Sequence, residues 1–198
     1  MSISLSLKSL FGSITISETS NESLMVRYAV KKDSKVLAQL YDNCADDLYH
    51  FLVTLSDDEL AKEIAQRSWL KVIEKSHLYR QSGSFKSWLF TLARRTLIDE
   101  FRKLKRFDEL HEDSLPIASE GFPEVKVSQE QSEALFNKVF NRALVKLPLL
   151  QKEAFCLQQE GFSLTDISAM TNAEPETIKS RLRYAKTALR KALENHRD

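Results

Sequence analysis

The sequence predicts an all-α fold made of two small helical domains, and three features of the chain support this prediction. The 198 residues include only four glycines and four prolines, and 29% of them are charged. Leu, Lys, Glu and Ala are plentiful, which is typical of soluble helical proteins. From residue 36 onward, apolar residues recur at the spacing of one face of an α-helix. A chain of this length can bury one ordinary core or two small ones, and a linker described below favours two.

Residues 1–33 form an N-terminal extension without a durable helical period. Ser alternates there with Ile or Leu, which is compatible with a short strand and with a disordered tail, and the pattern does not decide between them. The segment lacks a basic start followed by an apolar block, so it is not predicted to be a secretion signal. The first convincing helix is expected to begin after this extension.

Residues 34–106 are predicted to form the first domain. An apolar stripe over residues 36–55 predicts its first helix. The sequence SDDE at 56–59 is typical of a capping box, so a second helix is expected to begin there with Ser56 as its N-cap. The apolar residues of this helix, Trp69 among them, occupy two faces. It is therefore expected to be sandwiched or to offer one face to a partner.

A third helix is predicted to begin at Phe85, after a polar loop at 79–84. Its apolar residues point inward, and its outer face carries a cluster of cations within 94–106. The next segment, 107–128, is acidic, contains proline and glycine and lacks a helical stripe, so it is predicted to be a flexible linker. The formal net charge of +1 therefore conceals two basic regions separated by an acidic one.

Residues 129–198 are predicted to form a second domain of four helices, the first at about 129–146. The ends of the other three are indicated by residues with known preferences for such places: Pro148 and Gly161 for the second, the capping box SLTD at 163–166 for the third, Asn172 for the turn, and Pro175 for the fourth. A short helix, a tight turn and a long basic helix together are typical of a helix-turn-helix.

The last helix carries two parallel stripes. The apolar stripe consists of Ile178, Leu182, Ala185 and Leu189. The cationic stripe, one position later, consists of Lys179, Arg183, Lys186 and Arg190. A basic stripe can be only a solvated face, but the capped helix and turn before it favour a helix that enters the major groove of DNA. In that hypothesis, the side chains within reach of bases are Lys179, Ser180, Arg183 and Tyr184, and those within reach of phosphates are Lys186 and Arg190.

Two blocks of the sequence resemble parts of the bacterial sigma-70 family. The first resembles the promoter-melting segment and reads FKSWLFTLARRTLIDEFRKLKR. The second resembles region four and reads LPLLQKEAFCLQQEGFSLTDISAMTNAEPETIKSRLRYAKTALRKAL. Both occur in the family's order, with a linker in place of region three, which is the layout of extracytoplasmic-function (ECF) sigma factors. The resemblance covers roughly residues 36–106 and 130–194.

This resemblance implies an alternative sigma factor, a subunit that binds the clamp and flap of core RNA polymerase and directs it to promoter DNA. Region two would grip the clamp and open the minus-ten element, and region four would read the minus-thirty-five element as a duplex. An anti-sigma factor is an implied partner. The alternative is a helix-turn-helix regulator that binds duplex DNA without acting as a polymerase subunit.

Matching to the family's motifs gives three sets of candidate contacts. The candidates for polymerase binding are Glu63, Gln66, Trp69 and Leu70, although Trp69 also suits plain core packing. The candidates for the minus-ten element are Tyr79, Arg80, Ser82, Phe85, Arg94, Arg95, Arg102 and Lys105. For the minus-thirty-five element, the match adds Thr177 and Arg181 to the six side chains named above. The chain departs from the family at Arg67, where an acidic residue is usual.

Several other functions are excluded by the sequence. Cys44 and Cys156 fall at apolar helical positions and are predicted to be buried free thiols, which suits a reducing cytoplasm. The four histidines are scattered without the spacing of a metal site, so neither a metal nor a cofactor is expected. The acidic residues crowd into the linker without paired spacing on a helix, so an enzyme is not predicted. No run approaches the roughly 18 apolar residues of a membrane helix.

Overall fold

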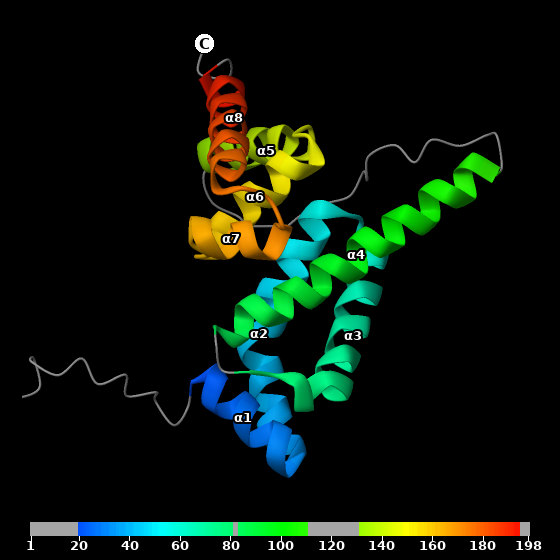
Figure 1. Ribbon diagram of the computed structural model, residues 1–198. Coiled ribbons are helices and arrows are strands. Elements are labelled where there is room, and N and C mark those ends of the chain that lie inside the picture. The colour runs from blue at the N-terminus through cyan, green and yellow to red at the C-terminus, as the bar shows by residue number, and fades with distance from the viewer. Residues whose placement is uncertain (1–19, 81–82, 111–130, 195–198) are drawn as a thin grey trace, which may run out of the picture.

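The computed structural model describes residues 20–80, 83–110 and 131–194 of the chain (Figure 1). The first half contains α1 (Asn21–Lys31), α2 (Ser34–Leu55), α3 (Asp58–Lys75), the 3-10 turn η1 (Ser76–Leu78) and α4 (Phe85–Leu110). The second half contains α5 (Gln131–Val145), α6 (Leu149–Gln159), α7 (Leu164–Thr171) and α8 (Pro175–Glu194). No strand occurs in this described part, which confirms the predicted all-α class. Within the same ranges, no helix combines the length and the apolar character needed to cross a membrane.

Helix α2 is the centre of the first half. It packs against α1, α3 and α4, and the apolar stripe predicted for residues 36–55 is its buried face. The buried side chains of α2 are Val36, Leu40, Cys44, Leu48, Phe51, Leu52, Val53 and Leu55. Because this stripe runs from one end of the 22-residue helix to the other, α2 has a buried face along its whole length and serves as the scaffold for its three neighbours.

Helix α1 corrects the expectation for residues 1–33, because it lies within the segment that showed no helical period. Ser20 caps its first turn, and Lys32 ends it in a left-handed conformation with a φ of 53°. Its buried side chains are Leu24, Met25 and Tyr28. An 11-residue helix is marginal by itself, so packing on α2 is what stabilises it. Residues 1–19 lie outside the described part of the chain.

The boundary between α2 and α3 also differs from the prediction. Asp57, not Ser56, is the N-cap of α3, and its carboxylate accepts a hydrogen bond from the N–H of Leu60 at 2.8 Å. The hydroxyl of Ser56 instead donates to the carbonyl oxygen of Leu52 at 2.8 Å, at the end of α2. Both side chains can cap a helix, and the one-residue difference arises because Ser56 is needed to close the helix before it.

Helix α4 extends farther than predicted, to Leu110, and so takes up the first four residues of the expected linker at 107–128. Glu109 and Leu110 are good helix formers, and Phe107 is tolerated in a helix interior. No proline or glycine interrupts the sequence before Pro116. The remainder of the expected linker, from residue 111, lies outside the described residues.

The second half contains the predicted helix-turn-helix in α7 and α8. The hydroxyl of Ser163 accepts from the N–H of Asp166 at 3.1 Å, and the carboxylate of Asp166 accepts from the N–H of Ser163 at 3.0 Å, which confirms the capping box. Gly161 has a φ of 87° and Asn172 a φ of 52°, the left-handed conformation that these residue types tolerate best. Pro175 is the first residue of α8, as predicted.

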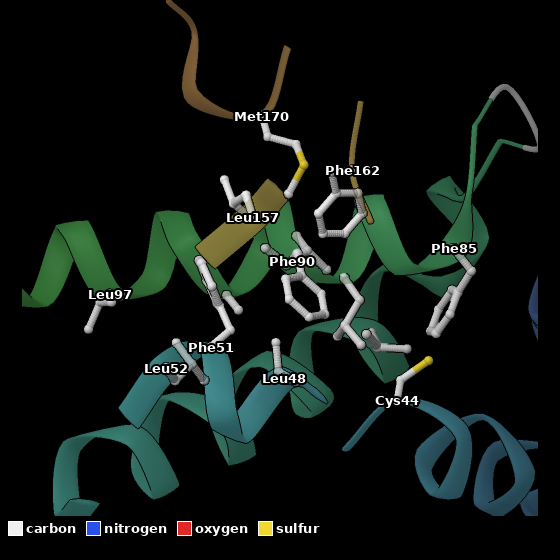
Figure 2. Packing of buried hydrophobic residues seen from close by; sticks show 14 of the residues in the cluster. Cys44, Leu48, Phe51, Leu52, Phe85, Phe90, Leu97, Leu157, Phe162 and Met170 are labelled. Carbon is white, nitrogen blue, oxygen red and sulfur yellow. The ribbon is translucent and has the colours of Figure 1, made fainter. Parts of the chain in front are cut away.

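The two halves pack against each other through an apolar interface. Helix α6 contacts α2 and helix α7 contacts α4, while α5 and α8 lie farther from the first half (Figure 1). Figure 2 shows Leu157, Phe162 and Met170 of the second half pointing towards Phe90 of α4. The rings of Phe90 and Phe162 meet edge to face with 5.2 Å between their centres, and Phe51 of α2 lies 5.2 Å from Phe90 on the other side. The two predicted domains therefore share one core in this arrangement.

Replacing Phe90 with alanine should lower the free energy of unfolding by about 3–5 kcal/mol, because Phe90 is fully buried between α2 and the second half. Urea unfolding followed by circular dichroism measures this loss. The matched control is Phe136→Ala, which removes a ring that is 54% exposed and should cost less than about 1 kcal/mol. Equal losses at the two positions would contradict the burial of Phe90.

Candidate functional site

The cationic side of α8 is exposed while its apolar side is buried, as expected for a helix that reads DNA. The buried side chains are Ile178, Leu182, Ala185 and Leu189. The candidates for duplex contact that are exposed are Thr177, Lys179, Arg183, Tyr184, Lys186 and Arg190. Ser180 and Arg181 are half-buried. All eight residues therefore lie on one helix whose core stripe holds it against α5, α6 and α7.

Two local contacts order the exposed face of α8. The guanidinium of Arg183 lies over the ring of Tyr184, with 5.2 Å between its central carbon and the ring centre. The ammonium of Lys179 pairs with the carboxylate of Glu176 at 3.1 Å. Exposed pairs of this kind contribute little stability and exchange readily for another anion. The pair therefore does not prevent Lys179 from binding another acceptor.

The loop before α4 gathers aromatic side chains. Tyr79 and Phe85 lie beside Trp88, with ring centres 5.3 Å apart for Tyr79 and Trp88 and 6.1 Å apart for Phe85 and Trp88. Tyr79 and Phe85 are buried, Trp88 is half-buried and Arg80 is exposed. Ser82, a further candidate for the minus-ten element, lies outside the described residues. The described part of the loop thus presents an aromatic cluster with one cation at its edge.

The outer face of α4 carries only some of its predicted cations in the open. Arg95 and Arg102 are exposed, and Arg102 pairs with Asp99 at 3.3 Å. Lys105 lies in the helix, but its side chain is outside the described part. Arg94 differs from the others because its side chain is only 15% exposed and faces the second half of the chain. The sequence could not indicate this, because Arg94 is on the outer face of the first half.

Two ion pairs join the halves. The guanidinium of Arg94 donates to both carboxylate oxygens of Glu153, from Nε at 2.7 Å and from Nη2 at 3.2 Å, and the Glu153 side chain is 2% exposed. The ammonium of Lys86 bridges Asp47 of α2 at 2.6 Å and Glu160, the residue that caps the end of α6, at 2.8 Å. Burial lowers the pKa of Lys86, but the hydrogen bonds to Asp47 and Glu160 outweigh it and raise the pKa overall. Lys86 therefore stays charged between two carboxylates.

A largely apolar groove runs between α2 and α3 and contains three of the four candidates for polymerase binding. Its lining includes Tyr41, Tyr49, Ala65, Gln66, Trp69, Leu70 and Ile73. Leu70 is 57% exposed, and the ring of Trp69 lies 5.2 Å from that of Tyr41. The indole N–H of Trp69 is buried and finds no acceptor among the described residues. Trp69 is thus a wall of the groove as well as part of the core.

Glu63, the fourth candidate, lies on α3 beside Arg67, the position at which the chain departs from the family. Arg67 donates to Glu63 at 3.2 Å and to Glu100 of α4 at 2.8 Å. The hydrogen bond from Arg67 is the main cause of the lowered pKa of Glu100, and Lys103 adds to it. The unusual cation at 67 therefore has a structural role, because it ties α3 to α4.

A second groove, between α5, α6 and α8, was not singled out from the sequence. Its lining includes Phe136, Phe140, Phe155, Leu189, Arg190 and Leu193. The rings of Phe136 and Phe140 stack with 6.4 Å between centres and an interplanar angle of 10°. The sequence does carry a signal for it, because the helix predicted at 129–146 has two apolar stripes where a helix packed on one side needs only one. These stripes are Phe136, Phe140, Leu144 and Leu147 on one face and Leu135, Val139 and Ala143 on the next.

The two cysteines are buried, and neither they nor the histidines of the described ranges, His50 and His77, belong to a metal-binding group. Cys44 and Cys156 are buried free thiols, as predicted. Burial raises the pKa of Cys44 to about 11 and that of Cys156 to about 12. Among the residues that the structure describes, no His, Cys, Asp and Glu side chains are grouped so that they could hold a metal ion.

Comparison with known proteins identifies relatives along most of the chain. The family model for sigma-70 region 2 matches residues 40–107. The ECF RNA polymerase sigma factor RpoE of Cereibacter sphaeroides is 32% identical over 80% of this chain and 87% of its own length. The ECF RNA polymerase sigma factor EcfG of Rhodopseudomonas palustris is 29% identical over 76% of this chain and 84% of its own length.

Two solved structures share the fold. The sigma factor RpoE of Bartonella quintana, in complex with the anti-sigma factor NepR, has a TM-score of 0.69 at 26% identity and covers 79% of this chain and 96% of its own. CnrH, in complex with the cytosolic domain of CnrY, has a TM-score of 0.61 at 14% identity and covers 89% and 99%. At 14% identity, the likeness to CnrH supports the fold and no statement about function.

Removing the Glu153 carboxylate with Glu153→Ala should lower the free energy of unfolding by about 3–5 kcal/mol, because it leaves the guanidinium of Arg94 unpaired in a largely buried place. Urea unfolding measures the loss. A double variant, Arg94→Met with Glu153→Leu, should recover most of it, since both charges are then replaced by apolar side chains. A double variant as unstable as Glu153→Ala would show that the pair is not what the interface requires.

Proposed function

The chain belongs to the ECF sigma factors of the bacterial sigma-70 family, and we propose that it divides polymerase binding, strand opening and duplex reading among the surfaces described above. As an alternative sigma factor, it directs promoter-specific transcription initiation by RNA polymerase. We assign it no catalytic residue and no cofactor. Its place of action is the cytoplasm, where RNA polymerase and the chromosome are found.

The groove between α2 and α3 is the surface we propose for the clamp of core polymerase. The observation that carries this proposal is the exposed Leu70 beside the Trp69 wall, in the half that matches sigma-70 region 2. Exposed apolar side chains in a shaped groove are typical of protein interfaces, and aromatic side chains often dominate their binding energy. Gln66 lies in the groove and Glu63 next to it on α3, so both can contribute polar contacts at its rim.

The aromatic loop and the outer face of α4 are the surface we propose for the melted minus-ten strand. Binding of an unpaired strand requires cations that follow its backbone and a platform on which a base can stack. Arg95 and Arg102 are exposed and can follow the backbone of the strand. The cluster of Tyr79, Phe85 and Trp88, with Arg80 beside it, can provide the platform for a base. Because Tyr79 and Phe85 are buried, we assign them to the support of the platform and not to its open surface.

The exposed face of α8 is the surface we propose for the minus-thirty-five element. Its N-terminal half carries Lys179, Arg183 and Tyr184 in the open, where a recognition helix contacts base edges. Lys186 and Arg190 lie one and two turns farther along, where they can meet phosphates. The second groove, lined by Phe136 and its neighbours, is on the same half and is our candidate for the polymerase flap.

The packing of the halves also bears on regulation. Arg94 is bonded to Glu153 through Nε and Nη2, and its side chain is only 15% exposed between the halves, so the halves must separate before α4 engages a promoter with its full set of cations. The Bartonella quintana relative is described in complex with the anti-sigma factor NepR. We propose an anti-sigma partner of the same class for this chain, which would keep the halves together. A regulator without polymerase would leave the groove between α2 and α3 without a role.

Transcription with purified bacterial core polymerase tests the proposed function. On a library of random promoter sequences, under reducing conditions, the chain should select a discrete set of start sites. Leu70→Asp should lower its affinity for core polymerase by about 30-fold or more, because it places a charge in the apolar groove. The matched control is Leu104→Asp on α4, outside the groove, which should bind core polymerase like the wild type. Binding of duplex DNA without any association with polymerase would instead favour the regulator.

Lys186→Ala should weaken binding to the selected promoter duplexes about equally for all sequences. Because it removes one phosphate contact, the slope of log affinity against log salt should decrease in magnitude by about 0.9. Fluorescence anisotropy over a salt series measures this slope. Lys35→Ala, an exposed lysine at the start of α2, serves as the control and should leave the slope unchanged. An unchanged slope for Lys186→Ala would remove Lys186 from the phosphate contacts.

A further inference from the structure

Helix α1 contacts both ends of the loop that carries Tyr79. From these contacts we propose that Glu22 and Lys32, at opposite ends of α1, are positioning residues that hold Phe85 and Tyr79, at the two ends of the loop between η1 and α4, in the places required to capture an unpaired minus-ten base. The proposal rests on the strand-opening function proposed above. It adds a role for a helix that the sequence did not predict and that lies before the residues matched by the family model, 40–107.

At the α4 end of the loop, Glu22 binds the first residue of the helix. Its carboxylate accepts a hydrogen bond from the backbone N–H of Phe85 at 2.9 Å. The first N–H groups of a helix have no partner inside it, and a carboxylate there also interacts favourably with the helix dipole. Ser84 provides the second cap, because its hydroxyl accepts from the N–H of Ser87 at 3.0 Å. Glu22 therefore sets where α4 begins, from a position 63 residues earlier in the chain.

At the other end of the loop, Lys32 binds the start of η1. Its ammonium donates to the hydroxyl of Ser76, a side chain with no exposed surface. The hydroxyl of Ser76 donates in turn to the carbonyl oxygen of Ile73 at 2.8 Å, at the end of α3. The carbonyl oxygen of Ser76 accepts a hydrogen bond from the N–H of Tyr79 at 3.2 Å. Ser76 therefore links Lys32, through its hydroxyl, to Tyr79 of the aromatic cluster, through its carbonyl group.

Helix α1 is itself fixed, and so can act as a frame. Leu24 and Met25 are buried in the core that α2 organises. The amide of Asn21 donates to the sulfur of Cys44 at 3.4 Å and accepts from the amide of Asn43 at 2.7 Å, both on α2. A helix held on α2 by packing and by hydrogen bonds cannot shift without disturbing the core. Through α1, both ends of the loop are therefore held in fixed positions relative to α2.

The aromatic cluster lies between the two contacts. Phe85 supplies both the N–H that Glu22 binds and a ring that meets Tyr79 and Trp88. Burial, with a smaller contribution from the nearby Glu22 charge, raises the pKa of Tyr79 to about 12. Tyr79 therefore stays a neutral phenol beside the carboxylate. A small displacement of Phe85 would move the ring on which the other two depend.

The test compares Glu22→Ala with Glu22→Gln in the holoenzyme on a promoter recovered from the random library. Permanganate reactivity of unpaired thymines measures opening of the minus-ten element. Glu22→Ala should reduce the open complex by about 10-fold or more, since it removes a charge-assisted hydrogen bond. Glu22→Gln keeps an acceptor oxygen and should stay within about threefold of the wild type. In the free chain, hydrogen exchange at the Phe85 amide should be faster in Glu22→Ala than in Glu22→Gln.

Three controls separate positioning from folding. Core-polymerase binding and binding of the minus-thirty-five duplex should be unchanged in Glu22→Ala, which shows that both halves still fold. Glu59→Ala, which removes an exposed carboxylate from the first turn of α3, should open the promoter like the wild type. Lys32→Met should reduce opening, while Lys31→Met, at the exposed neighbouring lysine, should not.

The outcomes distinguish this inference from the proposed function. If the wild-type chain opens no promoter, the proposed function fails and the inference fails with it. If the wild type opens promoters and Glu22→Ala opens them equally well, the inference alone is overturned. Equal losses of opening in Glu22→Ala and Glu22→Gln would also overturn it, because Gln keeps the acceptor for the N–H of Phe85. A parallel loss of core-polymerase binding would overturn it as well, because the effect would then not be specific to the loop.

Discussion

The contact between the two halves of the chain determines which of its surfaces are open. Helices α6 and α7 lie on α2 and α4, and Phe90, Leu157 and Phe162 fill a core to which both halves contribute. At the edge of that core, Arg94 and Glu153 are paired almost without solvent. Removing two charges from water costs about as much as their attraction returns, so a pair of this kind adds little net stability. The apolar side chains supply the attraction, and the paired charges restrict how the halves can meet.

The packing of the two halves covers one of the three proposed binding surfaces more than the other two. The groove beside Leu70 and the face of α8 around Tyr184 remain exposed while the halves are packed together. The face of α4 proposed for strand opening is different, because its Arg94 is bound by Glu153 of the second half. With the surfaces assigned as proposed, core polymerase and duplex DNA can bind while the halves are packed together, whereas a melted strand has to compete with Glu153 for Arg94. Such competition suits a factor whose activity is controlled by a partner.

The features that could be predicted from the sequence are those with a local chemical cause. The helix-turn-helix is marked by the capping box at 163–166, by Asn172 in a left-handed turn and by Pro175, and each acts within a few residues. Helix α1 has a local cap in Ser20 but no continuous apolar stripe, and it depends on packing against α2, as the burial of Arg94 depends on Glu153 in the other half. The sequence correctly places Arg94 on the outer face of α4 in the first half. That face is covered by the second half, which the pattern of α4 alone does not reveal. The DNA and polymerase contacts of individual side chains remain predictions.

The burial of both cysteines has a consequence for how such a factor can respond to its surroundings. Thiols with pKa values of about 11 and 12 are almost wholly protonated at neutral pH. Peroxides and disulfides react with thiolates, so these two sulfurs are poor chemical sensors. An oxidant in the cell would leave Cys44 and Cys156 unaltered as long as the helices around them stay packed. A response of this chain to redox conditions would therefore have to come through a binding partner and not through oxidation of its own two cysteines.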